Sequence, residues 1–335
     1  MDEVKKIAVV VLNWNGRKLL EEFLPSLTEY NHKDAQVYVA DNASNDDSVA
    51  YVKANFPMVK IIQNKTNGGY AKGYNDALEN LNEPLLCLIN SDVSVTANWL
   101  NPILEQFENE PNTAVIQPKI LDYKVKNHFE YAGAGGGFLD KYAYPFCRGR
   151  IFDTLEEDKG QYNEAKPIFW ASGACLFIRK VVFEEVGKLD ESYFAHQEEI
   201  DLCWRINNAS YEVWYNPNSV IYHLGGATLN SQNPKKTFLN FRNSLFNIVK
   251  NAPKKGLFFL VFTRLILDGI AGVKLMLSLK PLHTWAIVKS HFSFYAHLSE
   301  MLEKRNKNTT LKKYYFTKSI VWQYYVKGKK YFTNL

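Results

Sequence analysis

Three carboxylates lie within four residues at Glu198-Glu199-Ile200-Asp201. Like charges this close repel one another unless a cation or a proton relieves them, and carboxylates held together in a cleft tend to have raised pKa values. A raised pKa suits a general base, for which Glu199 and Glu198 are the candidates. The alternative is the solvated start of an acidic helix. The aromatic and apolar flanks, Phe194 and Trp204 among them, favour the catalytic interpretation.

Two other residues have the chemistry of metal ligands. Asp92, in Asn90-Ser91-Asp92-Val93, follows a run that is typical of a strand. A carboxylate there can hold a divalent cation that bridges a diphosphate, although capping of the next helix is the more common role. His223 ends another strand-like run and precedes two glycines. A neutral imidazole can bind a metal, but a lone histidine is more often structural.

A pair of glycines precedes an expected helix at Asn67-Gly68-Gly69. Without Cβ atoms the backbone can approach a ligand closely, and the N-terminus of a helix attracts anions. Lys72 lies one turn into that helix, within reach of a phosphate. A simple turn is the alternative, because one glycine pair is weak evidence.

Alternating strands and helices must position these residues. We expect strands over 7–12, 36–40, 59–63 and 85–89, with helices over 18–27, 48–55 and 70–81. This alternation predicts a mostly parallel sheet with helices on both faces, and such sheets bind ligands beyond the carboxyl ends of their strands. Polar residues follow each strand there: Asn13 and Asn15, Asp41 and Asn42, Asn64 and Asn67, and Asn90 and Asp92.

The middle of the chain is less regular, and a strand-like segment is expected over 168–179. From residue 236 onward the sequence is rich in Phe, Leu, Tyr and Lys. Residues 256–279 are strongly apolar but contain Arg264, Asp268 and Lys274. Three charges disfavour a membrane span, so we expect amphipathic helices. They either pack on the preceding domain or lie on a membrane surface, with Lys and Arg facing the head groups.

Composition narrows the class of protein further. A chain of 335 residues suits one large α/β domain with an appendage, or two modest domains. The net charge of +5 is too mild to imply nucleic acid. Four scattered cysteines without a CxxC pair are typical of reduced thiols in the cytoplasm. No signal-peptide core follows Met1, so we expect a cytoplasmic protein.

Taken together, these segments resemble the inverting glycosyltransferases of family 2, which have the GT-A fold, and especially their rhamnosyltransferase-like branch. The resemblance covers roughly residues 5–250 and depends on the order and spacing of its motifs. The motifs are Val10-Val11-Leu12-Asn13-Trp14-Asn15, Val39-Ala40-Asp41-Asn42-Ala43-Ser44, Asn67-Gly68-Gly69-Tyr70-Ala71-Lys72-Gly73, Leu88-Ile89-Asn90-Ser91-Asp92-Val93, Ser172-Gly173-Ala174, residues 198–205 and His223.

The resemblance implies a Rossmann-like GT-A catalytic domain over 1–235, followed by a helical, basic and aromatic region over 236–335. The nucleotide-sugar half would span about 1–95 and the acceptor half about 96–235. Asp92 and His223 would bind Mg²⁺ or Mn²⁺, and Glu199, or Glu198 in its place, would deprotonate the acceptor hydroxyl. The nucleotide would contact Asn13, Asn15, Asp41, Asn67, Gly69, Lys72, Asn75 and Ser91, and the acceptor Trp170, Ser172, Gly173, Ala174 and Asp201.

Two positions depart from the family pattern. Asn90 stands where the DXD-type metal motif has its first carboxylate, and Glu199 stands where the base is usually Asp. The implied reaction is transfer from a dTDP- or UDP-sugar, with dTDP-rhamnose as one candidate, to a hydroxyl of a glycan or lipid-linked glycan. The setting would be cell-surface polysaccharide synthesis, at the inner face of the plasma membrane if the C-terminal helices contact lipid. A homodimer is compatible with the chain.

Two competing interpretations remain. A nucleotidyltransferase usually carries a long, basic, glycine-rich loop after its first strand, whereas Asn13-Trp14-Asn15-Gly16 offers one glycine and a single nearby arginine, Arg17. The other is a non-catalytic scaffold or sugar-binding module on the same fold. The presence of Glu199, Asp92 and His223 favours an enzyme.

Overall fold

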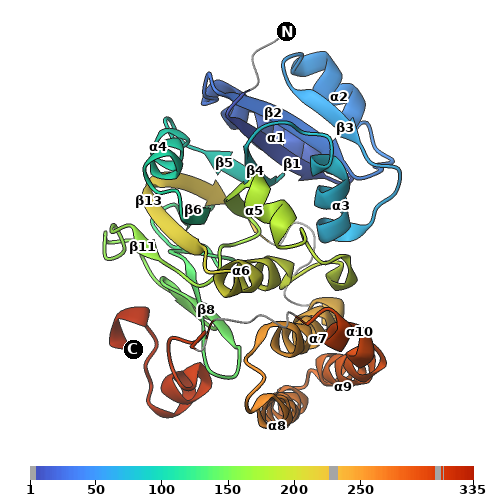
Figure 1. The fold of residues 1–335 in the computed structure, drawn as a ribbon, viewed down its shortest axis with the longest axis vertical. Coiled ribbons are helices and arrows are strands. Elements are labelled where there is room, and N and C mark those ends of the chain that lie inside the picture. Colours follow the sequence, from blue (N-terminus) through green and yellow to red (C-terminus); the bar gives the residue numbers. More distant parts are fainter. Residues whose placement is uncertain (1–4, 226–232, 306–310, 312) are drawn as a thin grey trace.

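The computed structural model describes residues 5–225, 233–305, 311 and 313–335, and Figure 1 shows its fold. Within this part of the chain a nine-stranded sheet runs in the order β11-β13-β6-β12-β4-β1-β2-β3, with β5 paired to β13. Its strands are β1 (Ile7–Asn13), β2 (Ala35–Asp41), β3 (Lys60–Gln63), β4 (Leu85–Asn90), β5 (Val93–Val95), β6 (Thr113–Asp122), β11 (Lys166–Pro167), β12 (Cys175–Arg179) and β13 (Glu212–His223).

The first half is the expected parallel β/α arrangement. Strand β1 pairs in parallel with β2 and β4, and β2 pairs in parallel with β3. Alternate residues of β1 enter different cores: Ile7, Val9 and Val11 pack on one face, and Ala8 and Val10 on the other. A strand that buries both faces must be apolar throughout, which explains the continuous Val-rich run.

Helices cover both faces of the sheet. Buried leucines of α1 (Arg17–Glu29) and α4 (Asn101–Asn109) share one core with Val52 of α2 (Ser48–Asn55). The opposite core contains residues of α3 (Gly69–Leu78), α5 (Lys180–Glu185) and α6 (Glu198–Asn208). The predicted layered α/β fold is therefore confirmed.

The second half departs from parallel order at β12, which runs antiparallel between β4 and β6. The strand-like segment expected over 168–179 is shorter than predicted, because β12 begins only at Cys175. The residues before it turn away: the indole of Trp170 is buried beside Gly137 and its Nε1 donates a hydrogen bond to the carbonyl of Phe138, 3.0 Å away. Apolar character alone did not reveal this turn.

A second, antiparallel sheet occupies the irregular middle of the chain. It contains β7 (Gly137–Leu139), β8 (Pro145–Cys147), β9 (Arg150–Ile151) and β10 (Thr154–Leu155). The end of the chain packs against it, because the rings of Phe316 and Phe332 both lie 5.2 Å from that of Phe138. The described part of the chain also contains three short helical turns, η1 (Glu191–Tyr193), η2 (Trp322–Val326) and η3 (Phe332–Asn334).

The expected C-terminal helical region is also confirmed. It contains α7 (Pro234–Asn251), α8 (Leu257–Leu277), α9 (Pro281–Ala296) and α10 (Leu298–Glu303). In Figure 1 these helices lie at the end of the molecule opposite α2 and β3. Within the described parts of the chain, no helix combines the length and apolarity needed to cross a bilayer.

Candidate active site

The carboxyl ends of β1 and β2 bring Asn13 and Asp41 together. The two residues are register partners, and both are buried. The amide nitrogen Nδ2 of Asn13 donates to Asp41 Oδ1 (3.2 Å) and to Ser44 Oγ (3.3 Å). Asn15 joins them, because its backbone N–H donates to the same Ser44 hydroxyl. Three of the predicted nucleotide residues thus form one polar group at the sheet edge.

Asn67 and Gly69 continue this edge through Asn42. The oxygen Oδ1 of Asn67 accepts hydrogen bonds from Asn42 Nδ2 and from the N–H of Gly69, both at 3.0 Å. Gly69 has φ +84°, and a Cβ there would lie 2.4 Å from the carbonyl oxygen of Phe194. Glycine is therefore needed for close packing of α3 against the segment that leads into α6.

Lys72 and Asn75 face that same segment. Lys72 Nζ lies 2.8 Å from Asp76 Oδ1 and 3.9 Å from Glu191 Oε2. Asn75 Nδ2 donates to the carbonyl of Leu189 and to Glu191 Oε1. These contacts hold residues 189–191 against α3. Ser91, by contrast, lies beside the polar group formed by Asn13, Asn15 and Asp41. A Cβ added at Gly16, which follows Asn15, would lie 3.7 Å from Ser91 Oγ.

The structure brings Asp92 and His223 together from positions 131 residues apart. Strand β5 pairs antiparallel with β13, which places Val93 opposite His223. As a result, His223 Nε2 lies 3.1 Å from Asp92 Oδ1, and both side chains are buried. The carboxylate of Glu130, which was not predicted from the sequence, lies 3.3 Å from the other ring nitrogen of His223.

Two carboxylates dominate the electrostatics of His223. Burial opposes a charge on the imidazole, but Glu130 and Asp92 outweigh it and raise the pKa of His223 to about 10. Glu130 is held in place by the N–H of Ala132, which donates to its Oε2, and it lies beside Gly225, where a Cβ would come within 2.9 Å of Oε1. The sequence offers no regular spacing that links Glu130 to His223.

The pair of Asp92 and His223 fits a divalent cation that is shared with a substrate, on condition that the cation displaces the proton that the raised pKa keeps on His223. Carboxylate and imidazole are both accepted by Mn²⁺, and Mg²⁺ is often bound by one or two carboxylates plus substrate phosphates. Among the described residues, no group of three or more His, Cys, Asp and Glu side chains is arranged to hold a metal. A cation held by this pair would complete its coordination with water or with the oxygens of a diphosphate.

Replacing Glu130 with Gln is expected to weaken Mn²⁺ binding by about 10- to 100-fold, the usual effect of losing a carboxylate that orients a ligating histidine. Calorimetric titration of Mn²⁺ in the presence of UDP or dTDP measures this directly, without turnover. Glu157→Gln, on the neighbouring surface loop, is the matched control and should leave the affinity unchanged. An unaltered affinity in Glu130→Gln would exclude the orienting role.

Glu198 and Glu199 are the first two residues of α6, and few local contacts compensate for the burial of their carboxylates. Glu198 is 3% exposed, and the Oε2 atoms of both residues are buried without a hydrogen-bond partner in the described structure. Burial raises the pKa of Glu199 to about 7. Burial, followed by the charge of Glu199, raises that of Glu198. A carboxylate that titrates near neutral pH can accept a proton at physiological pH.

The backbone that leads into α6 is strained. Phe194, His196 and Gln197 all have positive φ, at 63°, 68° and 74°. Such conformations persist in non-glycine residues only where the surroundings enforce them, and they cluster at functional sites. Here α7 enforces them: Asn243 Nδ2 donates to the carbonyls of Ala195 and His196, and Asn247 Nδ2 donates to that of Gln197.

Of the predicted acceptor residues, Gly173 is connected to these carboxylates through Tyr70. Its carbonyl accepts a hydrogen bond from the hydroxyl of Tyr70, 2.7 Å away. Burial raises the pKa of Tyr70, and the nearby charges of Glu198 and Glu199 raise it further. The three other residues of that segment, Trp170, Ser172 and Ala174, are buried behind it.

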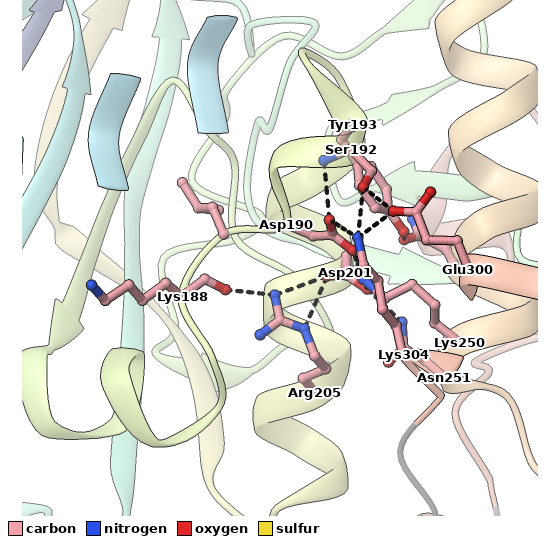
Figure 2. A network of polar contacts seen from close by, with 12 residues as sticks. Lys188, Asp190, Ser192, Tyr193, Asp201, Arg205, Lys250, Asn251, Glu300 and Lys304 are labelled. Carbon is pink, nitrogen blue, oxygen red and sulfur yellow. Dashed lines mark hydrogen bonds and ion pairs between the residues drawn. The ribbon is translucent and has the colours of Figure 1, made fainter. Parts of the chain in front are cut away.

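Asp201 contacts the protein and not a solvent-filled space. Its carboxylate accepts hydrogen bonds from Arg205 and Asn251 and pairs with Lys250 Nζ at 2.8 Å (Figure 2). Lys250 also pairs with Asp190 Oδ2 at 2.6 Å. Asp190 in turn pairs with Lys304, whose Nζ also contacts Glu300. This network connects α6 to α7 and α10, so it positions the helix that carries Glu199.

Known proteins are similar to this chain in sequence. An N-acetylglucosaminyl-diphospho-decaprenol L-rhamnosyltransferase of Mycobacterium tuberculosis is 25% identical over 233 residues, which cover 65% of this chain and 75% of that protein. A low-salt glycan biosynthesis hexosyltransferase of Haloferax volcanii is 24% identical over 206 residues, or 59% of this chain and 61% of that protein.

Solved structures show that the fold is shared more widely. A mannosyltransferase from Pyrobaculum calidifontis, in complex with GDP-Man and Mn²⁺, has a TM-score of 0.54 at 12% identity, covering 88% of each chain. GalNAc-T7 with UDP, GalNAc and Mn²⁺ has a TM-score of 0.53 at 15% identity, covering 70% of this chain and 48% of that one. These likenesses identify the fold as GT-A.

The family assignment follows from the sequence itself. The model of glycosyl transferase family 2 matches residues 8–187, which is more than half of the 335 residues. This stretch contains Asn13, Asp41 and Asp92 at the sheet edge. A glycosyltransferase is therefore favoured over both the nucleotidyltransferase and the non-catalytic interpretation, and the chain belongs to glycosyl transferase family 2.

Proposed function

We propose that this glycosyltransferase inverts the anomeric centre of a nucleotide-diphosphate sugar and uses Glu199 as its base. The observation that carries the proposal is the pair of carboxylates of Glu198 and Glu199 at the start of α6, near Tyr70, whose Oε2 atoms are buried without a hydrogen-bond partner in the described structure. Burying a carboxylate oxygen without a partner costs free energy, and groups perturbed in this way cluster at functional sites.

The reaction is a single displacement. Asn13 and Asp41 would bind the nucleoside, and Asp92 and His223 would be the residues that hold Mg²⁺ or Mn²⁺. The cation, when bound, neutralises charge on the leaving group. Glu199 accepts the proton of the acceptor hydroxyl while the acceptor oxygen bonds to the anomeric carbon. The bond from that carbon to the diphosphate oxygen breaks, and the nucleoside diphosphate leaves with both electrons.

We infer a dTDP- or UDP-sugar as donor, with dTDP-rhamnose as the leading candidate, and a lipid-linked glycan as acceptor. The name of the Mycobacterium tuberculosis relative specifies an L-rhamnosyl group and a lipid diphosphate that carries N-acetylglucosamine. The same chemistry in this chain would serve cell-surface polysaccharide synthesis from the cytoplasmic side of the membrane.

Nucleotide binding tests the proposal. Titration of UDP and of dTDP into the protein with Mn²⁺ should give saturable binding of at least one, and EDTA should weaken it. The control is Asp92→Asn, which keeps the size of the side chain but loses its charge, and in which Mn²⁺ should no longer strengthen binding. Binding of GDP in place of both would redirect the search to another donor class, and binding of none would contradict the proposal.

A further inference from the structure

Helix α8 exposes its apolar side and buries its charges. Residues Phe259, Phe262, Ile266, Ile270, Val273 and Leu277 are all at least half exposed. They recur at intervals of three and four residues, so at about 100° per residue they form one stripe along the helix. Arg264 and Asp268 lie on the opposite side and are 3% and 0% exposed. This is the reverse of a helix that packs its apolar face on a protein core.

The buried charges fix this orientation. Arg264 Nε donates to Asp268 Oδ1 at 2.8 Å, and its Nη1 donates to the carbonyl of Tyr142 at 2.9 Å. The hydroxyl of Tyr144 donates to the same aspartate oxygen at 3.0 Å, and the Arg264 guanidinium lies 3.8 Å from the Tyr144 ring centre. Rotating α8 to bury its stripe would break these contacts. These contacts with Tyr142 and Tyr144 therefore keep the apolar side of α8 facing away from the protein.

Helix α9 extends the same exposed surface. It packs beside α8, with the hydroxyl of Thr284 donating to the carbonyl of Gly272 at 2.9 Å. Its own exposed residues again recur at about three-residue steps: Leu282, Trp285, Val288, Phe292 and Tyr295. We call these residues and the stripe of α8 the α8–α9 face. Exposed apolar side chains in this number on two neighbouring helices indicate an interaction site.

The charges around the α8–α9 face are of one sign. Between residues 252 and 299 the exposed charged side chains are lysines, and Asp268, the one acidic residue of that stretch, is buried. The lysines are Lys254, Lys255, Lys274, Lys280 and Lys289. Exposed Trp285 and Tyr295 add the aromatic side chains that favour the boundary between lipid and water.

We propose that the α8–α9 face docks on a lipid bilayer whose head groups are anionic. An apolar surface bordered by lysines and aromatic rings matches that environment, since the apolar side chains enter the acyl boundary while the lysines meet the phosphates. A second copy of this chain would place the lysine rims of two molecules against each other, which disfavours a dimer through this face. The proposal depends on neither the donor nor the acceptor assigned above.

Vesicle flotation of the full chain tests the docking. Binding is expected to vesicles of phosphatidylcholine mixed equally with phosphatidylglycerol, and to be much weaker with phosphatidylcholine alone. Each apolar side chain of this size that enters the bilayer contributes about tenfold. Serine at Phe262, Ile266 and Ile270 together should therefore abolish flotation. The matched control places serine at three exposed apolar positions of the catalytic part: Met58, Val125 and Val181.

A charge-reversal variant provides an independent test. Each lysine near an anionic surface contributes about fivefold, so Lys274→Glu, Lys280→Glu and Lys289→Glu together should weaken binding roughly 100-fold. The same change at Lys53, Lys65 and Lys166 is the control and should have little effect. Binding by wild type should also fall as salt screens the lysines.

Three outcomes would overturn the proposal. The first is that wild-type protein does not float with anionic vesicles, and the second is that the control variants lose as much vesicle binding as the variants of the α8–α9 face. The third is that light scattering shows a wild-type dimer that the serine variant converts to a monomer. The last would assign the face to self-association. Nucleotide binding by calorimetry is measured in parallel. Loss of flotation with unchanged nucleotide binding separates failure of docking from failure of the proposed function.

Discussion

Glu199→Gln is expected to bind nucleotide like the wild type and to lose transfer activity by about 100- to 10,000-fold, the usual range for removing a general base. Glutamine keeps the size of the side chain and cannot accept the proton of the acceptor hydroxyl. The measurement is release of nucleoside diphosphate in the presence of acceptor, next to calorimetry with the nucleotide alone.

Glu198→Gln is the matched control, because Glu198 is the adjacent buried carboxylate. A larger loss in this variant than in Glu199→Gln would move the base to Glu198. The wild-type rate should rise with pH through about 7, since the pKa of Glu199 is raised to about 7 and the base acts only when deprotonated. Unchanged turnover in Glu199→Gln would refute the assignment of this residue.

Lys250→Met is expected to lower the free energy of unfolding by about 3 kcal/mol, the lower end of the range for removing one partner of a buried ion pair. Lys250 is 3% exposed in its side chain, and its ammonium lies between Asp190 and Asp201. The lower end applies because Arg205 and Lys304 remain to stabilise the two carboxylates. Urea denaturation at neutral pH measures the change.

Lys304→Met is the control, because the side chain of Lys304 is 35% exposed. A solvated ion pair contributes less than about 1 kcal/mol to the free energy of unfolding. The pH dependence has a definite sign. Burial opposes the charges of Asp190 and Asp201, but the neighbouring Lys and Arg cations outweigh it and lower both pKa values. The resulting stabilisation is complete above about pH 3.9, the pKa of a free aspartate, and is lost as the pH falls further. Equal stability of the two variants would contradict the role of Lys250.

The sequence predicted the parts of the site that lie directly at strand ends. Asn13 and Asp41 follow β1 and β2, and parallel neighbours must place such residues side by side. The proximity of Asp92 and His223 required a resemblance to a family, because it arises from an antiparallel pairing of β5 with the distant β13. Periodicity within either segment contains no information about that pairing.

Glu130 and Asn243 were missed for a different reason. Glu130 acts through His223, and Asn243 acts through the carbonyls before α6, and no spacing in the sequence links either residue to these distant partners. Asp201 shows the opposite case. The resemblance to the family implied contact with an acceptor, whereas in the structure Asp201 is fully buried in ion pairs.

The charges of α8 were correctly taken as evidence against a membrane span, but the face they occupy was not predictable. Arg264 and Asp268 are four residues apart and so share one side of the helix. Which side faces the protein is decided by Tyr142 and Tyr144, which precede them by more than 100 residues. Only the folded structure shows that the apolar side is the exposed one.

The most direct test of the central claim is transfer itself, followed by nuclear magnetic resonance of the product. Wild-type protein would be incubated with dTDP-rhamnose or a UDP-sugar, a lipid-diphosphate-linked N-acetylglucosamine acceptor and Mn²⁺, and again with EDTA. We expect release of nucleoside diphosphate that requires both acceptor and Mn²⁺, and a product whose anomeric configuration is the inverse of the donor's. Retention of configuration, or transfer that EDTA leaves unchanged, would contradict the mechanism built on Glu199, Asp92 and His223.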